Sequence, residues 1–243
     1  MGEGAAETHG VSLGDRVVAE QIVPCGECRF CQRGDYWMCL PHHIFGFKRY
    51  LNGGFARFNL FPAKARVHRV PESLTAGEAA YIEPMACAWH AVDRGEIKPG
   101  DTVVVGGVGN IGLCMLQIAS LSNPGQLIAL DTKAYRLDLA GQLGADVTID
   151  VTRENPVERV RALTDGDGCD VSIEASGSPA AIEPGLRMVR KLGTVVASAS
   201  STNPPPSTGP SSATPKNSPS TAATSAPTAT PRSSTRWRRG RWT

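Results

Sequence analysis

Four closely spaced cysteines, in the segment PCGECRFCQRGDYWMC, carry the most informative chemistry of the chain. Cys25, Cys28, Cys31 and Cys39 follow the spacing C-x2-C-x2-C-x7-C. Four thiolates at such separations can surround one ion and complete a tetrahedral shell, which leaves no coordination position for a substrate or water. We therefore predict a structural zinc (Zn2+) site, and we expect the reaction chemistry to lie elsewhere.

Three other interpretations of the cysteine run are weaker. Disulfides need an oxidising compartment, and residues 1–20 lack the pattern of a secretory signal. An iron–sulfur run ends in C-x3-C-P rather than C-x7-C. A zinc knuckle that binds nucleic acid needs basic and aromatic neighbours, which are partly supplied by Arg29, Phe30, Arg33, Tyr36 and Trp37.

The other three cysteines, Cys87, Cys114 and Cys169, lie in apolar stretches, which predicts buried thiols. Free thiols beside a thiolate metal site are typical of a reducing compartment, so we expect a cytoplasmic protein.

A second motif follows the apolar stretch DTVVVGG. The residues Gly107, Gly109, Asn110, Ile111 and Gly112 form a G-x-G-x-x-G pattern that opens a helical stretch. In such a turn the first glycine permits a tight bend, the second lets the backbone approach a pyrophosphate, and the third lets helix and strand pack closely. The helix N-terminus adds N–H groups and partial positive charge, so the pattern predicts a dinucleotide site.

Asp131 ends the next predicted strand, where a carboxylate can accept hydrogen bonds from both ribose hydroxyls of the adenosine half. Such a carboxylate repels a 2′-phosphate, which favours NAD over NADP. Lys133 and Arg136 lie nearby and count partly against that preference. The alternative is that Asp131 is a turn residue without a ligand.

Glu83 is an acidic residue in the apolar stretch YIEPMACAWHAV. Acids are rarely buried unless they are paired or bind a metal. From its surroundings alone, Glu83 is equally compatible with a partly exposed position at a break in a helix.

Composition limits the classes of function. The chain has 243 residues, of which 41% are hydrophobic, and no apolar run is long enough to span a membrane. The net charge of +2 is unevenly distributed, because residues 201–243 carry +6 and the rest carries −4. The body therefore has no general affinity for nucleic acid or anionic membrane, although the basic end RWRRGRW leaves a nucleic-acid-binding arm as an alternative.

Hydrophobic patterns divide the chain into three parts. Residues 1–75 predict a small β domain, with strands over 16–23, 53–61 and 66–70 and the cysteine run inserted as a lobe. Residues 201–243 are rich in Ser, Thr, Pro and Ala, which predicts a disordered tail.

Residues 76–200 predict a helical stretch interrupted near Pro84, followed by alternating strands and helices. The strands are expected over 101–107, 126–131, 146–151, 170–176 and 193–199, and the helices over 110–121, 134–144, 155–164 and 179–192. Such alternation is typical of an α/β fold with a parallel sheet covered on both faces.

Together these motifs resemble the zinc-dependent medium-chain alcohol dehydrogenases. The resemblance extends from residue 1 to about residue 199, and the Glu-Pro pair at Glu83 is closest to the polyol branch of sorbitol, threonine, erythritol and threitol dehydrogenases. It implies a GroES-like domain with a zinc lobe, a Rossmann domain, and assembly into homo-oligomers.

The resemblance also implies a reaction and a role for Glu83. A secondary alcohol, such as a small polyol, would be oxidised to a ketone with NAD. Glu83 would stand at a catalytic zinc, as a ligand or as a hydrogen-bond partner of its water.

Two departures from the family pattern lead to further expectations. The remaining catalytic zinc ligands of the family, a Cys and a Gly-His-Glu triplet, precede the segment that is here Gly2 to Ala6, so Glu83 is expected to lack them. The family pattern stops after Val195-Val196, which predicts a missing sixth strand and a frameshift in the gene. The alternative function is therefore a non-catalytic remnant that binds zinc and NAD.

Overall fold

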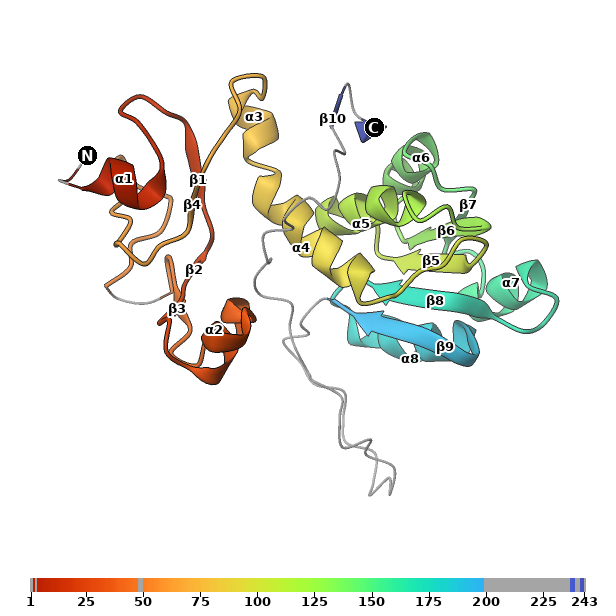
Figure 1. Ribbon diagram of the computed structural model, residues 1–243. Coiled ribbons are helices and arrows are strands. Elements are labelled where there is room, and N and C mark those ends of the chain that lie inside the picture. Colours follow the sequence, from red (N-terminus) through yellow and green to blue (C-terminus); the bar gives the residue numbers. More distant parts are fainter. Residues whose placement is uncertain (1, 3, 48–49, 199–236, 239–240, 243) are drawn as a thin grey trace. The chain divides into compact units, whose positions relative to one another are not determined.

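The computed structural model describes residues 2, 4–47, 50–198, 237–238 and 241–242. These residues fall into two compact units (Figure 1). The first unit contains Met1–Ala79, and the second begins at Ala80. None of the helices in the described part of the chain is long and apolar enough to cross a membrane.

Short antiparallel strand pairs build the first unit. Strand β1 (Val17–Ala19) pairs with β4 (Val67–Arg69), and β2 (Ile22–Val23) pairs with β3 (His43–Ile44). The other elements are the helices α1 (Ala5–His9), α2 (Arg29–Arg33) and α3 (Ala76–Ala79) and the 3₁₀ helix η1 (Tyr36–Met38). A small core of Ile22, Cys39 and Ile44 packs directly against the remaining cysteines of the run.

The strand predicted over 53–61 is not formed, and this prediction was wrong. The alternating pattern GGFARFNLF suits a strand, but a strand also needs a neighbour to satisfy its backbone groups. The described residues provide no such neighbour, and Phe55, Phe58 and Leu60 are exposed. Of the aromatic side chains in this stretch, that of Phe61 packs inward, edge-to-face on Phe45 at a ring separation of 5.6 Å.

The predicted helix break near Pro84 lies slightly earlier. Helix α3 ends at Ala79, and α4 (Ile82–Asp93) then includes Pro84 in its first turn. A proline is tolerated there because the N–H that it lacks has no partner within the helix at that position.

A five-stranded parallel sheet forms the centre of the second unit. Its strand order is β7-β6-β5-β8-β9, and the strands are β5 (Thr102–Gly106), β6 (Gln126–Asp131), β7 (Val147–Asp150), β8 (Cys169–Glu174) and β9 (Val189–Ala197). The intervening helices are α5 (Asn110–Ser120), α6 (Ala134–Gln142), α7 (Pro156–Leu163) and α8 (Pro179–Met188). The predicted α/β fold with a parallel sheet is therefore confirmed.

Alternation along β5 shows that both faces of the sheet are covered. Val103 and Val105 belong to a core cluster with α4 and α5, whereas Val104 belongs to a second cluster with Val160 of α7 and Met188 of α8. Successive side chains of a strand point to opposite faces, so the sheet is packed with helices on both sides.

The boundary between α8 and β9 differs from the prediction. Helix α8 ends at Met188, and β9 begins at Val189, which pairs with Cys169 before a bulge in the register. An ion pair explains why the strand begins before residue 193. Arg190 Nε donates to Asp170 Oδ1 at 2.6 Å, which holds the first residues of β9 beside β8.

The predicted disordered tail, residues 201–243, lies outside the described residues except for two short strands. These are β10 (Trp237–Arg238) and β11 (Arg241–Trp242), which pair antiparallel.

Candidate functional site

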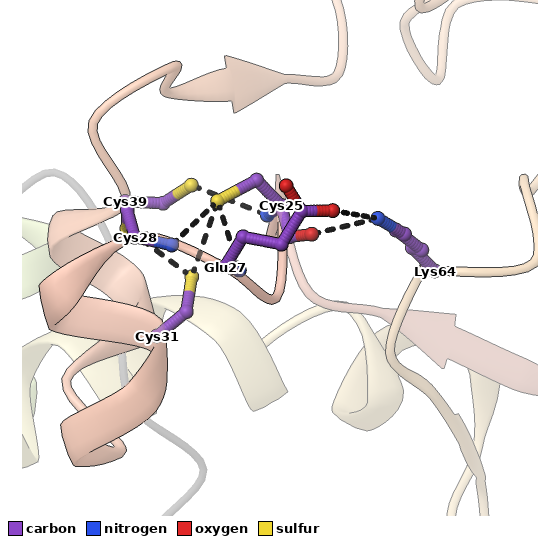
Figure 2. Close-up of polar contacts among 6 residues, drawn as sticks. All are labelled: Cys25, Glu27, Cys28, Cys31, Cys39 and Lys64. Atoms are coloured by element: carbon purple, nitrogen blue, oxygen red, sulfur yellow. Dashed lines mark hydrogen bonds and ion pairs between the residues drawn. The ribbon is translucent and has the colours of Figure 1, made fainter.

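The four cysteines of the run converge on one point (Figure 2). Their sulfur atoms all lie within 4.8 Å of one another. The Sγ atom of Cys31 is 3.5 Å from that of Cys28 and 3.9 Å from that of Cys25. No other group of three or more His, Cys, Asp or Glu side chains in the described residues is arranged to hold a metal.

Short local elements place these sulfurs. Cys25 follows β2, Cys28 is the N-cap of α2, Cys31 lies within α2, and Cys39 is the C-cap of η1. Backbone N–H groups point at the sulfurs: the amides of Glu27 and Cys28 donate to Cys25 Sγ at 3.4 and 3.3 Å, and the Cys25 amide donates to Cys39 Sγ at 3.3 Å.

These amides favour the thiolate form. Hydrogen bonds from the backbone N–H groups of Cys31 and Leu40 lower the pKa of Cys28 to about 6. The amides of Glu27 and Cys28 lower the pKa of Cys25 as well. Burial acts in the opposite direction on Cys31 and raises its pKa to about 12, so this sulfur needs a positive partner before it gives up its proton.

The cluster fits a zinc ion. A tetrahedral Zn–S bond of about 2.3 Å requires neighbouring sulfurs about 3.8 Å apart, and the two separations above bracket that value. Lys64 supports the cluster from outside, because its Nζ donates to the Cys25 carbonyl at 2.7 Å and lies 3.7 Å from Glu27 Oε1.

Of the other cysteines, Cys114 and Cys169 are buried as predicted. Cys87 is only partly buried, and its thiol donates at 3.2 Å to Oε1 of Glu83, one turn earlier in α4. The described residues place no group of metal ligands beside Glu83, so they do not fit a catalytic zinc there.

The glycine motif forms the turn between β5 and α5. Gly107 has φ +85°, and a Cβ atom there would stand 2.6 Å from Ser176. A Cβ on Gly112 would stand 1.9 Å from the Gly107 carbonyl oxygen. A Cβ on Gly109, in contrast, would meet nothing closer than Arg136 Nη1 at 3.8 Å, so the space beside Gly109 is open to a ligand.

Helix α5 begins at this turn with Asn110 and Ile111. No side chain caps its N-terminus, so its first N–H groups remain directed at the space in front of the turn. The side chain of Ile111 packs on the hydrophobic core, and only its backbone is placed to contact a ligand.

Asp131 is buried at the last position of β6. Its Oδ1 accepts hydrogen bonds from the N–H groups of Thr132 and Lys133 at 2.8 and 3.0 Å. Its Oδ2 lies 3.5 Å from Nη1 of Arg136. The loop amides thus fix the orientation of the carboxylate, which can accept from a pair of vicinal hydroxyls.

A cavity of about 560 Å³ joins these groups. It is lined by Gly107, Gly109, Asp131 and Arg136, and also by Glu174 and its neighbours. Gly106, Asp131 and Glu174 are the last residues of β5, β6 and β8, so the cavity lies at the carboxyl ends of the strands. The strand order reverses between β5 and β8, which is where α/β sheets bind their ligands.

Both units of the chain match known dehydrogenase domains. Residues 2–72 match the alcohol dehydrogenase GroES-like domain, and residues 110–223 match the zinc-binding dehydrogenase domain. The chain belongs to the zinc-dependent medium-chain alcohol dehydrogenase family. The resemblance predicted from the sequence is therefore confirmed.

One relative of this chain is an erythritol/L-threitol dehydrogenase of Mycolicibacterium smegmatis. The two are 47% identical over 79% of this chain and 53% of the relative. A sorbitol dehydrogenase of Halalkalibacterium halodurans is 37% identical over 79% of this chain and 55% of the relative. The chain thus spans about half the length of these curated relatives.

A solved structure extends the comparison to a bound cofactor. A zinc-binding dehydrogenase of Sinorhizobium meliloti, bound to NADP, has a TM-score of 0.71 and 32% identity, covering 76% of this chain and 54% of that chain.

Sequence reasoning missed two residues that shape the site. Glu174 lies within the strand predicted over 170–176, and an acid near the end of such an apolar strand was a usable signal. Lys64 gave no signal, because its contact with the Cys25 carbonyl joins residues 39 positions apart.

Proposed function

We propose that this chain is an NAD-linked oxidoreductase that oxidises a secondary alcohol of a small polyol to a ketone. In that reaction the carbinol carbon transfers a hydride to the nicotinamide ring and the hydroxyl loses a proton, so NAD+ becomes NADH. The observation that carries the proposal is the cavity at the carboxyl ends of β5, β6 and β8, which is lined by both the glycine turn and Asp131.

The cofactor half of the reaction has the stronger structural support. The open space beside Gly109 and the uncapped N-terminus of α5 suit a pyrophosphate, and the oriented carboxylate of Asp131 suits the adenosine ribose. The same carboxylate would repel a 2′-phosphate, so we propose NAD rather than the NADP of the Sinorhizobium meliloti protein. Arg136 would contribute positive charge beside the pyrophosphate.

The four cysteines would hold one structural zinc. Their sulfur separations and the N–H groups around them support this role. When bound, the metal would neutralise thiolate charge and hold the loop from Cys25 to Cys39 in one conformation. The family resemblance would also place Glu83 at a catalytic zinc, but the described residues bring no group of metal ligands to it, so we propose only the structural zinc for this chain.

The two halves of the proposal correspond to residues 1–75, as a GroES-like part with the zinc lobe, and residues 76–200, as the NAD-binding part. We also propose a cytoplasmic location, because free cysteines beside a thiolate metal site are typical of a reducing compartment. Homo-oligomers and a small polyol substrate are proposed from the family resemblance.

Substrate oxidation tests the proposal. The full chain, loaded with zinc, is assayed for NADH formation at 340 nm with erythritol, L-threitol and sorbitol, and Asp131→Ala serves as the control. We expect erythritol or L-threitol to be the best substrate, because the erythritol/L-threitol dehydrogenase is more similar to this chain than the sorbitol dehydrogenase. A chain that binds NAD+ but forms no NADH with any polyol would contradict the proposal and favour the non-catalytic alternative.

A further inference from the structure

Glu174 is a buried acid in the wall of the cavity, and nothing in the dinucleotide motif assigns it a role. It is only 5% exposed and is the last residue of β8. Its Oε1 accepts a hydrogen bond from the Ser176 N–H at 2.8 Å and a second, short one from the Ser176 hydroxyl. A buried carboxylate needs such partners, and here both come from one residue of the next turn.

The turn that follows Glu174 packs directly against Gly107 of the glycine motif. The Cα and N atoms of Ser176 lie 2.6 Å from the place where a Gly107 side chain would begin. The Ala175 N–H also donates to the Gly106 carbonyl at 2.8 Å, so a backbone hydrogen bond holds the start of this turn beside the end of β5. The turn after β8 and the turn after β5 therefore form one continuous wall.

A chain of hydrogen bonds carries this constraint into α8. The Ser178 N–H donates to the Ser176 hydroxyl oxygen at 3.1 Å, and Ser178 is the N-cap of α8. Ser176, Ser178 and Ala181 all line the cavity. The position of this wall thus depends on the link from Glu174 through Ser176 to Ser178.

We propose that Glu174 is a positioning residue of the cofactor cavity, which holds the turn of Ser176 against Gly107 so that the wall is formed before the cofactor binds. This inference rests on the proposed binding of NAD. Without the carboxylate, the Ser176 N–H and hydroxyl lose their acceptor, and the turn has to be ordered when the cofactor binds. That ordering cost lowers affinity without removing any direct contact with the ligand.

The test is a double-mutant cycle on NAD+ affinity, measured by calorimetry on the full chain. We expect Glu174→Ala and Ser176→Ala each to raise the Kd about five- to tenfold. The double variant should be no weaker than the single variants, because both remove the same link. Glu174→Gln and Ser176→Thr keep the acceptor and the hydroxyl, so they should stay within about twofold of the wild type.

A matched control separates positioning from general loss of stability. Asp170 lies at the other end of β8, outside the cavity, and bonds the Thr102 N–H at 2.7 Å and Arg190. Asp170→Ala should lower the melting temperature and leave the Kd for NAD+ unchanged. If Glu174→Ala does not fold, the comparison of Ser176→Ala with Ser176→Thr carries the test, because Ser176 is exposed.

Additive losses in the cycle, or an Asp170→Ala variant that binds NAD+ as weakly as Glu174→Ala, would overturn the inference. A wild-type chain that binds NAD+ while all variants match it would overturn the inference alone. A wild-type chain that binds no NAD+ would overturn the proposed function together with it.

Discussion

The Nζ atom of Lys64 donates a 2.7 Å hydrogen bond to the carbonyl oxygen of Cys25, and this contact ties the turn before β4 to the cysteine cluster. Lys64 also lies 3.7 Å from Glu27, whose own N–H points at Cys25 Sγ. The lysine therefore supplies positive charge beside a cluster that would carry four thiolates once zinc is bound.

Replacing Lys64 should weaken zinc retention without abolishing it. We expect Lys64→Ala to speed the transfer of zinc to a chromogenic chelator about five- to tenfold, because groups that orient metal ligands affect metal affinity. Lys64→Arg keeps a positively charged hydrogen-bond donor, so its rate of zinc transfer should stay close to that of the wild type. The exposed Lys98 of the second unit provides the control, and equal rates for Lys98→Ala and Lys64→Ala would contradict the role.

Removal of the metal should unfold the lobe. Elemental analysis of the purified chain is expected to give one zinc per chain, and Cys28→Ser should lower that value because the fourth thiolate is lost. Cys114→Ala changes a buried cysteine of the second unit and should leave the zinc content unchanged. Full zinc content in Cys28→Ser would count against the four-cysteine site.

Alanine substitutions at Gly109 and Gly112 should affect different properties, namely cofactor binding at Gly109 and stability at Gly112. A methyl group on Gly109 meets no protein atom closer than 3.8 Å, so Gly109→Ala should fold normally but bind NAD+ more weakly by tenfold or more. A methyl group on Gly112 would stand 1.9 Å from the Gly107 carbonyl, so Gly112→Ala should lose about 1–3 kcal/mol of stability.

Calorimetric melting and NAD+ titration of both glycine variants provide the measurement. Equal losses of stability at the two positions would contradict the assignment of separate roles.

His90 on α4 should titrate below the usual range of a histidine. Burial lowers the pKa of His90, and the positive charge of Arg94 lowers it further. A histidine whose folded pKa is depressed stabilises the fold above the unfolded pKa of about 6.5, and that contribution is lost as the pH falls below it. Unfolding free energy should therefore fall from pH 7.5 to pH 5.5, and His90→Gln should reduce that fall.

Direct titration of the His90 ring by NMR checks the direction of this shift. Arg94→Gln removes the positive charge beside His90 and should therefore raise the titration midpoint of the His90 ring. A midpoint above the range of an unperturbed histidine would contradict the effect of burial.

The features that could be predicted from the sequence are the local ones. The spacing of Cys25, Cys28 and Cys31 predicts that their sulfurs converge within a few residues, and the glycine motif predicts its own turn. The strands of the parallel sheet were also predicted, because buried strands of this kind are continuous apolar runs.

The features that could not be predicted depend on distant partners. The stretch 53–61 has a strand pattern but no neighbouring strand among the described residues, and pattern alone cannot supply one. The contact of Ser176 with Gly107 and that of Lys64 with Cys25 arise only when separate elements come together. The residues that carry the candidate chemistry could therefore be predicted from the sequence, whereas the residues that hold the cavity wall in place could not.

Cofactor choice tests the central claim most directly. Calorimetric titration of the full chain with NAD+ and NADP+ should give at least about tenfold tighter binding of NAD+, because the fixed carboxylate of Asp131 would accept ribose hydroxyls and would repel a 2′-phosphate. Asp131→Ser should narrow that difference. Binding of neither dinucleotide, or equal binding of NADP+ by the wild-type chain, would contradict the account.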